Sequence, residues 1–379
     1  MRILFLGGVG TIGSEALRDL VASTDFEITI GDADVEKAKQ FARSLASDRL
    51  DVEYLNADNE SKLVDILKGY QAVTNALPFK YDLPVTRAAI EAGVSGVDVS
   101  SALQQFELSQ KATAEGVTFV PGCGMTPGVT NVLVGKAYAD LDGISEVHIA
   151  WAAFRCLAPS PGLLTTTFWE FQPDLEDRAY FMDGKYVAVP PFSGAKTINF
   201  PGPIGPQEVY FVPHPEIWTL PRSFPELRRV DVRGAWPPET MRLLRVVLDF
   251  GFYRPSKVRV GGSESTPLDL LSECLLKLPQ AKETALWGYS VHLEVVGVKE
   301  ERTRRYIFTC SHPHMDRWGG KAAYAKNVGI PLSIATQELV QGRVKLTGVV
   351  APELAFDSTR FIDQLQARGI HVSESVQNA

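Results

Sequence analysis

The sequence has few cysteines and no long hydrophobic run, and each absence excludes a class of protein. Its 379 residues include four cysteines, none of them in a Cys-x-x-Cys pair. Cysteines this scattered argue against a disulfide framework or a structural zinc and fit a reducing compartment. No stretch approaches the roughly 20 apolar residues that cross a bilayer, and the short N-terminal apolar run lacks the cleavage site of a signal peptide. We therefore expect a cytoplasmic protein without a membrane span.

Basic residues are also fewer than acidic residues. Lysine and arginine total 38 against 45 aspartates and glutamates, which gives a formal net charge of −7. Because no basic stripe offsets this balance, nucleic acid is not expected as a partner. The sequence has no repeats or low-complexity segments, and its 45% apolar and 22% charged residues are typical of a soluble globular protein. A chain of this length suits two domains.

Glycine, in contrast, is concentrated at the start of the chain. A short apolar run is followed by Gly8-Val-Gly-Thr-Ile-Gly13 and then by an amphipathic stretch. This is the strand, tight turn and helix start that hold a dinucleotide pyrophosphate: Gly8 allows the turn, Gly10 lets the backbone approach the phosphates, and Gly13 lets the helix pack close to the strand. The anion would lie on the unpaired amides at the positive end of the helix. The expected cofactor contacts in this loop are Gly8, Val9, Gly10, Thr11, Ile12 and Gly13.

An acidic residue follows where a ribose-binding carboxylate is expected. Residues 27–32 have the pattern of a second strand that ends at Asp32, about twenty residues after the last glycine. A carboxylate here accepts hydrogen bonds from the ribose hydroxyls and repels a 2′-phosphate. Asp34 adds negative charge, and the next basic side chain is Lys37. The sequence therefore predicts NAD rather than NADP, unless Asp32 only caps a helix in a related fold that binds no dinucleotide.

Strands and helices alternate through about residue 125. Expected strands cover 52–56, 71–78, 95–99 and 118–120, and expected helices cover 34–45, 60–68 and 82–92. This alternation predicts an α/β fold with a doubly wound parallel sheet of the Rossmann type. Ligands in such sheets bind at the carboxyl ends of the strands. The expected cofactor contacts at these ends are Asp58, Ala76, Leu77, Pro78, Gly124 and Pro127.

The pattern changes after about residue 145. Segments such as 147–154 and 290–298 alternate apolar and polar residues, which predicts a mostly antiparallel sheet, with one helix at 238–250. Helical periodicity returns at 322–327, 333–341 and 356–369, and we expect these helices to pack back on the first domain. The predicted division is a dinucleotide-binding domain of residues 1–126 and 320–379, with an inserted α+β domain of residues 127–319.

A second glycine-rich segment, Pro121-Gly-Cys-Gly-Met-Thr-Pro-Gly-Val-Thr-Asn131, leaves a strand and enters a helix near Pro127. Two interpretations stay open. The helix start could contact the nicotinamide ribose or a substrate carboxylate, or the glycines could form a hinge between domains. Cys123 is expected to be a small buried residue rather than a reactive thiol.

The chain resembles the saccharopine dehydrogenase-like family, on the branch with saccharopine reductase, L-lysine 6-dehydrogenase and carboxynorspermidine dehydrogenase. The matching segments, in order, are Gly8–Gly13, Asn75-Ala-Leu-Pro78, Val97-Asp-Val-Ser100, Gly122-Cys-Gly-Met-Thr-Pro-Gly128, His214-Pro-Glu216, Thr219-Leu-Pro221, Gly329-Ile-Pro331 and Gly348-Val-Val-Ala-Pro-Glu353. The resemblance implies a Rossmann domain completed by C-terminal helices, an inserted sheet domain that forms homodimers, and NAD(P)-linked oxidation of an amine on an amino-acid-like substrate. Residues 154–162 depart from the Gly-Gly-Leu-Pro segment of those relatives, which favours a sister group and argues against lysine or saccharopine as the substrate.

Hydride transfer from an amine carbon requires an acid–base group with a pKa near neutrality. His214 is the leading candidate, with Glu216 as its orienting partner or as a counter-charge for the amine, unless this segment is only a sheet turn. Asp98, at the end of a strand, is the second candidate as base or amine anchor, unless it caps the next helix. Arg155 and Arg222 could clamp a substrate carboxylate, although either could be a solvated surface residue. Ser100 and Asn131 complete the expected substrate contacts.

No metal is expected. His312-Pro-His314-Met-Asp316 resembles a metal clip but lacks an obvious third ligand. The sequence therefore predicts an oxidoreductase that acts on a C–N bond of an amino-acid or opine-like small molecule. Two alternatives remain: a nucleotide-binding sensor or scaffold that has lost catalysis, and an ordinary alcohol or sugar dehydrogenase. The second would need a Tyr-x-x-x-Lys pair, and the pair with that spacing, Tyr253 and Lys257, lies in the inserted domain.

Overall fold

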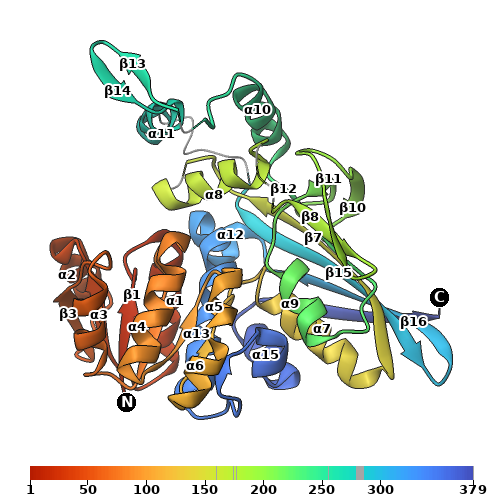
Figure 1. Ribbon diagram of the computed structural model, residues 1–379, viewed down its shortest axis with the longest axis horizontal. Coiled ribbons are helices and arrows are strands. Elements are labelled where there is room, and N and C mark those ends of the chain that lie inside the picture. Colours follow the sequence, from red (N-terminus) through yellow and green to blue (C-terminus); the bar gives the residue numbers. More distant parts are fainter. Residues whose placement is uncertain (159, 174, 176, 255, 279–285, 379) are drawn as a thin grey trace.

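The computed structural model describes residues 1–158, 160–173, 175, 177–254, 256–278 and 286–378. Two β-sheets lie side by side in this part of the chain, one built mainly from residues 2–120 and one from strands between residues 143 and 378 (Figure 1). No helix among these residues combines the length and apolarity that a membrane crossing needs.

The first sheet is parallel throughout, which confirms the predicted doubly wound fold. Within the described residues it has seven strands in the order β17-β6-β5-β4-β1-β2-β3. These are β1 (Arg2–Leu6), β2 (Glu27–Asp32), β3 (Leu50–Tyr54), β4 (Ala72–Asn75), β5 (Ser95–Asp98), β6 (Thr118–Val120) and β17 (Gly348–Val349). Ile3 and Phe5 of β1 enter one hydrophobic core, and Leu4 and Leu6 enter another. This central strand is therefore apolar on both faces, as a parallel strand between two helix layers must be.

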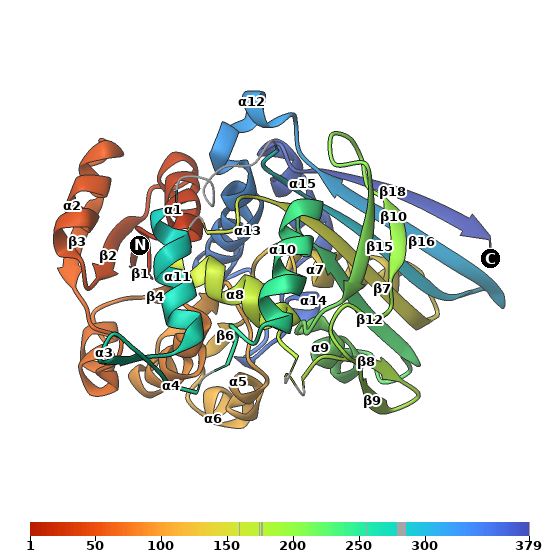
Figure 2. The same cartoon turned by 90° about the horizontal axis from the view of Figure 1, so that it is seen from above.

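Helices cover both faces of this sheet (Figure 2). They are α1 (Thr11–Ser23), α2 (Val35–Ser44), α3 (Glu60–Leu67), α4 (Asp82–Ala92), α5 (Leu103–Glu107), α6 (Ser109–Ala114) and α13 (Ala323–Val340). The sequence predicted two short helices in the region of α13, but the structure has one continuous helix with Pro331 inside it. This helix packs along α1 so closely that a Cβ on Gly329 would lie 2.7 Å from the Ala16 amide nitrogen. Burial against α1 explains why one long helix forms despite the proline.

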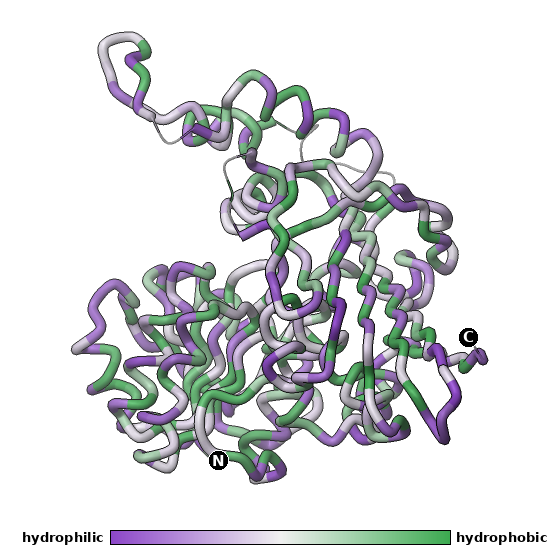
Figure 3. Tube along the Cα trace, turned by 45° about the vertical axis from the view of Figure 1, so that its right-hand side comes forward, coloured by the Kyte–Doolittle hydropathy of each residue, from purple (hydrophilic) through white to green (hydrophobic). Residues whose placement is uncertain are grey.

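The second sheet is mixed and mostly antiparallel, as predicted, with β12 and β7 as its parallel pair. Its main path among the described residues is β10-β11-β12-β7-β15-β16-β18, and β8 and β9 extend it beside β12. The strands are β7 (Gly143–Phe154), β8 (Ala179–Met182), β9 (Lys185–Ala188), β10 (Lys196–Asn199), β11 (Pro206–Phe211), β12 (Arg229–Ala235), β15 (Gly288–Lys299), β16 (Arg302–Ser311) and β18 (His371–Asn378). Figure 3 shows hydrophobic stretches running through the strands of both sheets.

The helices of the second half surround one face of this sheet and extend above it. They include α7 (Val129–Asp140), α8 (Pro161–Phe171), α9 (Glu216–Ser223), α10 (Pro238–Asp249), α11 (Pro267–Lys277), α12 (Met315–Trp318), α14 (Pro352–Ala355) and α15 (Ser358–Ala367). α8, α10 and α11 lie above the region between the two sheets, and the hairpin of β13 (Val258–Val260) and β14 (Ser263–Ser265) projects beyond them (Figures 1 and 2). Trp169 of α8 lies 6.2 Å, ring to ring, from Phe79, which follows β4. The second half of the chain therefore contacts the first sheet near the carboxyl end of a central strand.

The C-terminal segment serves both sheets, which differs from the predicted division. β17 joins the first sheet beside β6, but β18 pairs with β16 at the edge of the second sheet over eight residues. The predicted division places all of 320–379 in the first domain. Residues 371–378 are mostly polar and exposed, and they pair with the backbone groups of β16, which would otherwise be an open edge strand.

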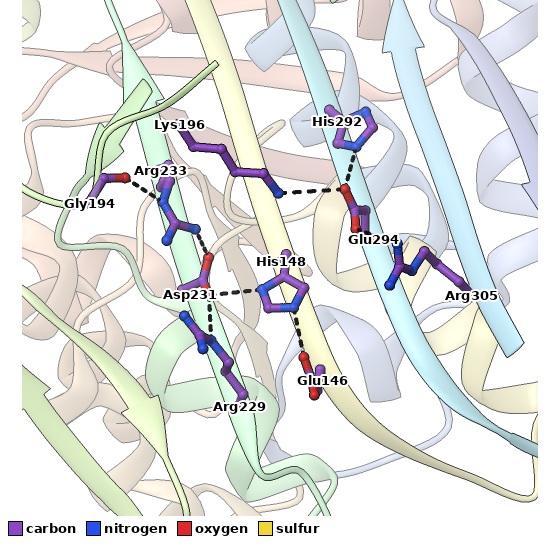
Figure 4. A network of polar contacts seen from close by, with 10 residues as sticks. All are labelled: Glu146, His148, Gly194, Lys196, Arg229, Asp231, Arg233, His292, Glu294 and Arg305. Carbon is purple, nitrogen blue, oxygen red and sulfur yellow. Dashed lines mark hydrogen bonds and ion pairs between the residues drawn. The ribbon is translucent and has the colours of Figure 1, made fainter. Parts of the chain in front are cut away.

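A charged network occupies the face of the second sheet that points away from the main core (Figure 4). Asp231 is fully buried there and accepts hydrogen bonds from Arg229 at 3.0 Å and from Arg233. The Nδ1 atom of His148 lies 2.8 Å from the same carboxylate. Burial alone would lower the pKa of His148, but the carboxylates of Asp231 and Glu146 raise it overall. These charges compensate one another across neighbouring strands, which accounts for so much charge on a half-buried sheet face.

Candidate functional site

The turn after β1 has the shape that a dinucleotide requires, but the left-handed residue is Gly7. Gly7 has φ +74°, and a Cβ there would lie 2.7 Å from the Ala76 carbonyl oxygen. A Cβ on Gly13 would overlap the Gly7 carbonyl oxygen and lie 2.9 Å from its carbonyl carbon. Gly8 lies within this turn, which the Gly10 amide closes by donating to the Gly7 carbonyl at 3.0 Å, but the residue with positive φ is Gly7. A Cβ at Gly8 would instead press on the core side chains of β1, β2 and α1.

The N-terminus of α1 follows this turn without a side-chain cap in the described part of the chain. The amides of the first helical turn have no intrahelical acceptor. Val9, Gly10, Thr11 and Ile12 all keep solvent exposure. The turn has no room for added Cβ atoms, so its backbone stays open to a close approach, and the helix that follows begins without a side-chain cap. These two features fit the pyrophosphate of a nicotinamide dinucleotide.

The other predicted cofactor contacts gather at the same edge of the sheet. Asp32 ends β2, and its Oδ1 accepts the Asp34 amide at 2.9 Å. Asp34, in turn, caps α2 through Lys37, so Asp32 is not the helix cap. Beyond β3, Asp58 is exposed and accepts from the Tyr81 hydroxyl at 3.0 Å. After β4, the segment of Ala76, Leu77 and Pro78 is tied back through the Leu77 amide, which donates to Asn75.

Asp98 is packed inside the protein rather than facing solvent. It is 0% exposed, and it accepts hydrogen bonds from Asn75 at 2.9 Å and from the Ser100 amide at 3.1 Å. Ser100 Oγ donates to a second buried carboxyl, Asp82, at 2.7 Å. Burial raises the pKa of Asp98 to about 7 and the pKa of Asp82 well above its usual range. In this structure Asp98 and Ser100 join β5 to its neighbours, and their predicted substrate roles stay predictions.

The segment from Pro121 to Asn131 uses its amides internally. The Gly122 and Cys123 amides donate to the Ser100 and Asp98 carbonyls, each at 2.7 Å. The Gly128 amide donates to Asn131 Oδ1 at 2.9 Å. These bonds occupy the amides of Gly122, Cys123 and Gly128, which favours the hinge interpretation for this part of the segment. The predicted cofactor contacts of Gly124 and Pro127 stay predictions. Burial raises the pKa of the Cys123 thiol well above its usual range, so this cysteine is not a reactive thiolate.

The side chain of Asn131 is bonded within the protein. Its amide nitrogen donates to Glu353 at 2.8 Å and to Thr219 at 3.2 Å. With its oxygen bound to Gly128, the side chain joins α7, α9 and α14. Asn131 is therefore an internal connector in the structure, and its predicted contact with substrate stays untested.

His214 and Glu216 form the pair that the sequence predicted. His214 lies just before α9 and is 8% exposed, and its Nδ1 is 3.1 Å from Glu216 Oε2. Glu216 is fully buried and accepts from the Thr130 hydroxyl of α7 at 2.7 Å. Burial alone would lower the pKa of His214, but the charges of Glu216 and Glu170 raise it overall. The histidine is thus oriented by a carboxylate that is itself held in place.

Glu170 was not identified from the sequence. It lies on α8, is 4% exposed, and accepts from Trp236 Nε1 at 2.8 Å. Burial raises its pKa to about 7, against the opposing charges of His214 and Arg155. The signal in the sequence was a lone acidic residue in the apolar stretch Leu163–Phe171. A buried acid with a pKa near neutrality belongs among the candidate acid–base groups.

Four aromatic rings connect these groups. Trp151 on β7 lies 5.8 Å from the His214 ring, 5.2 Å from Trp236 and 6.1 Å from Tyr289. Tyr289 lies 5.8 Å from Tyr324 on α13. We call this set the aromatic cluster: Trp151, Trp236, Tyr289 and Tyr324. It brings together β7, the residue that follows β12, β15 and α13, which are widely separated in the sequence.

The two predicted arginine clamps differ in their surroundings. Arg155 is 1% exposed, and its guanidinium lies 4.2 Å from the Trp236 ring centre. Its terminal nitrogens donate to the carbonyls of Cys156, Leu157 and Leu163 and to the Thr167 hydroxyl. Because both terminal nitrogens of its guanidinium already have acceptors, Arg155 stabilises the segment that leads into α8 and is not free to bind a substrate carboxylate. Arg222 is exposed on α9, with its guanidinium 5.9 Å from the Phe106 ring centre.

The histidines near residue 312 do not assemble a metal site in the described residues. His312 accepts the Tyr289 amide at Nε2 and stacks on Trp318, and His314 pairs with Asp316 on the surface. Among the described residues, no three His, Cys, Asp or Glu side chains gather as metal ligands.

Comparison with known proteins covers the whole fold. The sequence model of the saccharopine dehydrogenase NADP binding domain matches residues 3–120, and that of the saccharopine dehydrogenase C-terminal domain matches residues 124–370. The carboxyaminopropylagmatine dehydrogenase of Synechocystis sp. is 27% identical over 99% of this chain and 98% of its own length. The carboxynorspermidine synthase of Vibrio alginolyticus is 23% identical over 97% and 96%.

A solved structure shows the same fold. Saccharopine dehydrogenase (L-Glu forming) from Saccharomyces cerevisiae superposes with a TM-score of 0.71 at 18% identity, over 99% of both chains. The turn at Gly7 and the uncapped start of α1 agree with the dinucleotide-binding match to the first sheet. The chain belongs to the saccharopine dehydrogenase family of oxidoreductases that use a nicotinamide dinucleotide.

Proposed function

We propose that the protein breaks or forms the C–N bond that joins an amino-acid unit to a cationic amine. The observation that carries this proposal is the convergence of His214, Glu216 and Glu170 on the aromatic cluster, all within the protein interior. Aromatic faces and carboxylates both attract an alkylammonium group. The two relatives named for carboxyaminopropylagmatine and carboxynorspermidine act on amines of this class, and the amino-acid or opine-like substrate expected from the sequence agrees with them.

The reaction divides between the cofactor and the chain. When bound, the nicotinamide accepts a hydride from the carbon next to nitrogen, or returns it in the reverse direction. His214 takes a proton at Nε2, because Glu216 holds the Nδ1 side of the ring. Glu216 remains the orienting carboxylate, since Thr130 and His214 occupy its oxygens. The chain thus supplies a general base whose pKa is set by a fixed neighbour.

We also propose that the cofactor is NAD rather than NADP. The support is Asp32, whose carboxylate stands at the end of β2 where a ribose would lie and would repel a 2′-phosphate. The exposed Asp34 beside it adds to that repulsion. The matched family domain is named for NADP, so NADH and NADPH must be compared directly.

Three smaller expectations remain proposals. Residues 1–126 with the returning segment from 320, less the strand 371–378, would form the dinucleotide-binding domain, and residues 127–319 the inserted one. Homodimer formation is proposed from the family resemblance, and a cytoplasmic location from the scattered cysteines and the lack of a signal-peptide pattern in the sequence. Size-exclusion chromatography with light scattering tests the first of these two, and fractionation of cells tests the second.

The test of function is the oxidation or formation of reduced nicotinamide. The protein is mixed with NAD or NADP and carboxyaminopropylagmatine, and absorbance of the reduced ring is followed. We expect turnover with this class of amine, and a fall of about 10²-fold or more in His214→Ala with unchanged dinucleotide binding. Dinucleotide binding without turnover on any amine of the class would refute the proposal and favour a nucleotide sensor.

A further inference from the structure

Glu170 has one carboxylate oxygen committed and one available. Oε2 accepts the Trp236 indole hydrogen, whereas Oε1 has no hydrogen-bond partner among the residues that the structure describes. Glu170 therefore has one carboxylate oxygen that no described residue occupies.

His214 shows the same asymmetry. Its Nδ1 faces Glu216, and across the described ranges its Nε2 has no partner and is not a fully buried orphan. No hydrogen bond or ion pair joins Glu170 to His214 in this part of the chain, although each charge influences the pKa of the other residue. His214 and the Trp236 ring that holds Glu170 both pack against Trp151. Glu170 and His214 therefore both approach the aromatic cluster through Trp151 and Trp236, without binding each other in the described part of the chain.

We propose that the substrate nitrogen binds between Glu170 Oε1 and His214 Nε2, and that Glu170 carries the proton to and from that nitrogen. This assignment rests on the proposed function and adds a second acid–base group to it. Glu170 enters the site from α8, which also contacts Phe79 beside the cofactor edge of the first sheet. One helix thus approaches both the amine chemistry and the end of the strand at which the cofactor binds.

The proton balance of the oxidation explains why two groups are needed. A secondary ammonium gives one proton to Glu170, and hydride then leaves the adjacent carbon as the C=N bond forms. Water adds to that carbon, and its proton passes to His214. Glu170 then returns its proton to the nitrogen, and the C–N bond breaks. The hydroxyl group becomes a carbonyl as its proton passes to the departing amine, which leaves as a primary ammonium. The sum converts ammonium, water and oxidised nicotinamide into a carbonyl compound, a primary ammonium, reduced nicotinamide and one proton, which leaves through His214.

The surroundings suit this role. Burial raises the pKa of Glu170 to about 7, where a carboxyl group both accepts and donates protons near neutrality. The Arg155 guanidinium, against the same Trp236 ring, partly offsets the charge when Glu170 is ionised. The substrate class is therefore an amine that enters as a cation.

Agmatine, a primary amine with a cationic tail, is a probe that needs no turnover. Its binding is measured by quenching of the intrinsic tryptophan fluorescence, since Trp151 and Trp236 line the site. We expect Glu170→Gln, which keeps an oxygen for Trp236, to bind agmatine at least about tenfold more weakly. Glu338→Gln is the matched control. Glu338, on α13, is also a buried glutamate, with 2% exposure, but it pairs with Arg343 and Arg360 rather than with the aromatic cluster. Equal binding in wild type and Glu170→Gln, or no binding to the wild type, would overturn the proposal.

Turnover of carboxyaminopropylagmatine gives the second readout. We expect Glu170→Gln to lower kcat by about 10²-fold or more and to remove one ionisation from the pH profile, with Glu170→Asp restoring part of both. A wild-type enzyme that turns over while Glu170→Gln matches it would leave the proposed function standing and refute this role. Glu170-dependent agmatine binding without turnover would refute the proposed function and retain the binding site.

Discussion

Replacement of Gly13 by alanine tests the dinucleotide site most directly. The new Cβ would overlap the Gly7 carbonyl oxygen and lie 2.9 Å from the carbonyl carbon, against an optimal separation of about 3.5 Å or more. Gly7 cannot retreat, because its other side already faces the Ala76 carbonyl. Forcing a methyl group into such a site costs about 1–3 kcal/mol. The turn and the start of α1 must therefore separate.

That separation should weaken binding more than folding. If one charge-assisted hydrogen bond to the pyrophosphate is lost, about 1.5–3 kcal/mol, the dinucleotide dissociation constant rises about tenfold or more. The assay is NADH titration by fluorescence, with thermal unfolding of the same samples. Gly143→Ala is the control, since a Cβ at Gly143 meets nothing within 4 Å. Wild-type NADH affinity in the Gly13→Ala variant would refute the assignment of this turn as the pyrophosphate site.

Three further substitutions address selectivity, pH dependence and structure. Asp32→Ser should tighten NADPH binding about tenfold by removing a like charge, and unchanged preference in paired titrations would contradict the NAD proposal. Glu170 has a folded pKa of about 7 against an ordinary 4.5; its stabilisation is complete below pH 4.5 and is lost as the pH rises through 7, by at most about 3 kcal/mol. Thermal melts of Glu170→Gln should therefore depend less on pH, and an unaltered dependence would place the titration elsewhere. Asn131→Ala should cost about 2–4 kcal/mol in urea unfolding, because Gly128 and Glu353 lose their partner; normal stability with lost agmatine binding would instead support contact with substrate.

The first sheet was predictable because its signals are local. β1 is a short apolar run, the helices that were predicted follow their strands within a few residues, and the glycine turn lies within one stretch of thirteen residues. The two-residue strand β17 has no such local signal and was not predicted. The position of the left-handed glycine was not predictable, since Gly7 and Gly8 are adjacent and identical. What separates them is the Ala76 carbonyl, which a different strand brings against Gly7. Long-range packing likewise made one helix of α13 and placed β18 in the second sheet.

The acid–base site was only half predictable for a related reason. His214 and Glu216 are two residues apart, so their pairing was visible in the sequence. Glu170 meets them only after α8 folds across β12 and Trp236 supplies a hydrogen bond. Arg155 was expected to bind a carboxylate, because a sequence does not show that three nearby carbonyl groups occupy a guanidinium.

The two halves of the site therefore respond differently to mutation. The pyrophosphate turn depends on backbone contacts within the first sheet, so a change at Gly13 alters dinucleotide affinity without reaching the aromatic cluster. The amine site depends on side chains from β7, α8, α9 and β12, so a change at Glu170 alters proton transfer without reaching the turn. The contact between Trp169 and Phe79 is one place where the two halves meet, and α13, which carries Tyr324 and packs along α1, is another. If closure of α8 over the cofactor edge couples them, Trp169→Ala will weaken agmatine binding only when the dinucleotide is present, whereas equal weakening with and without it would show that the two halves act independently.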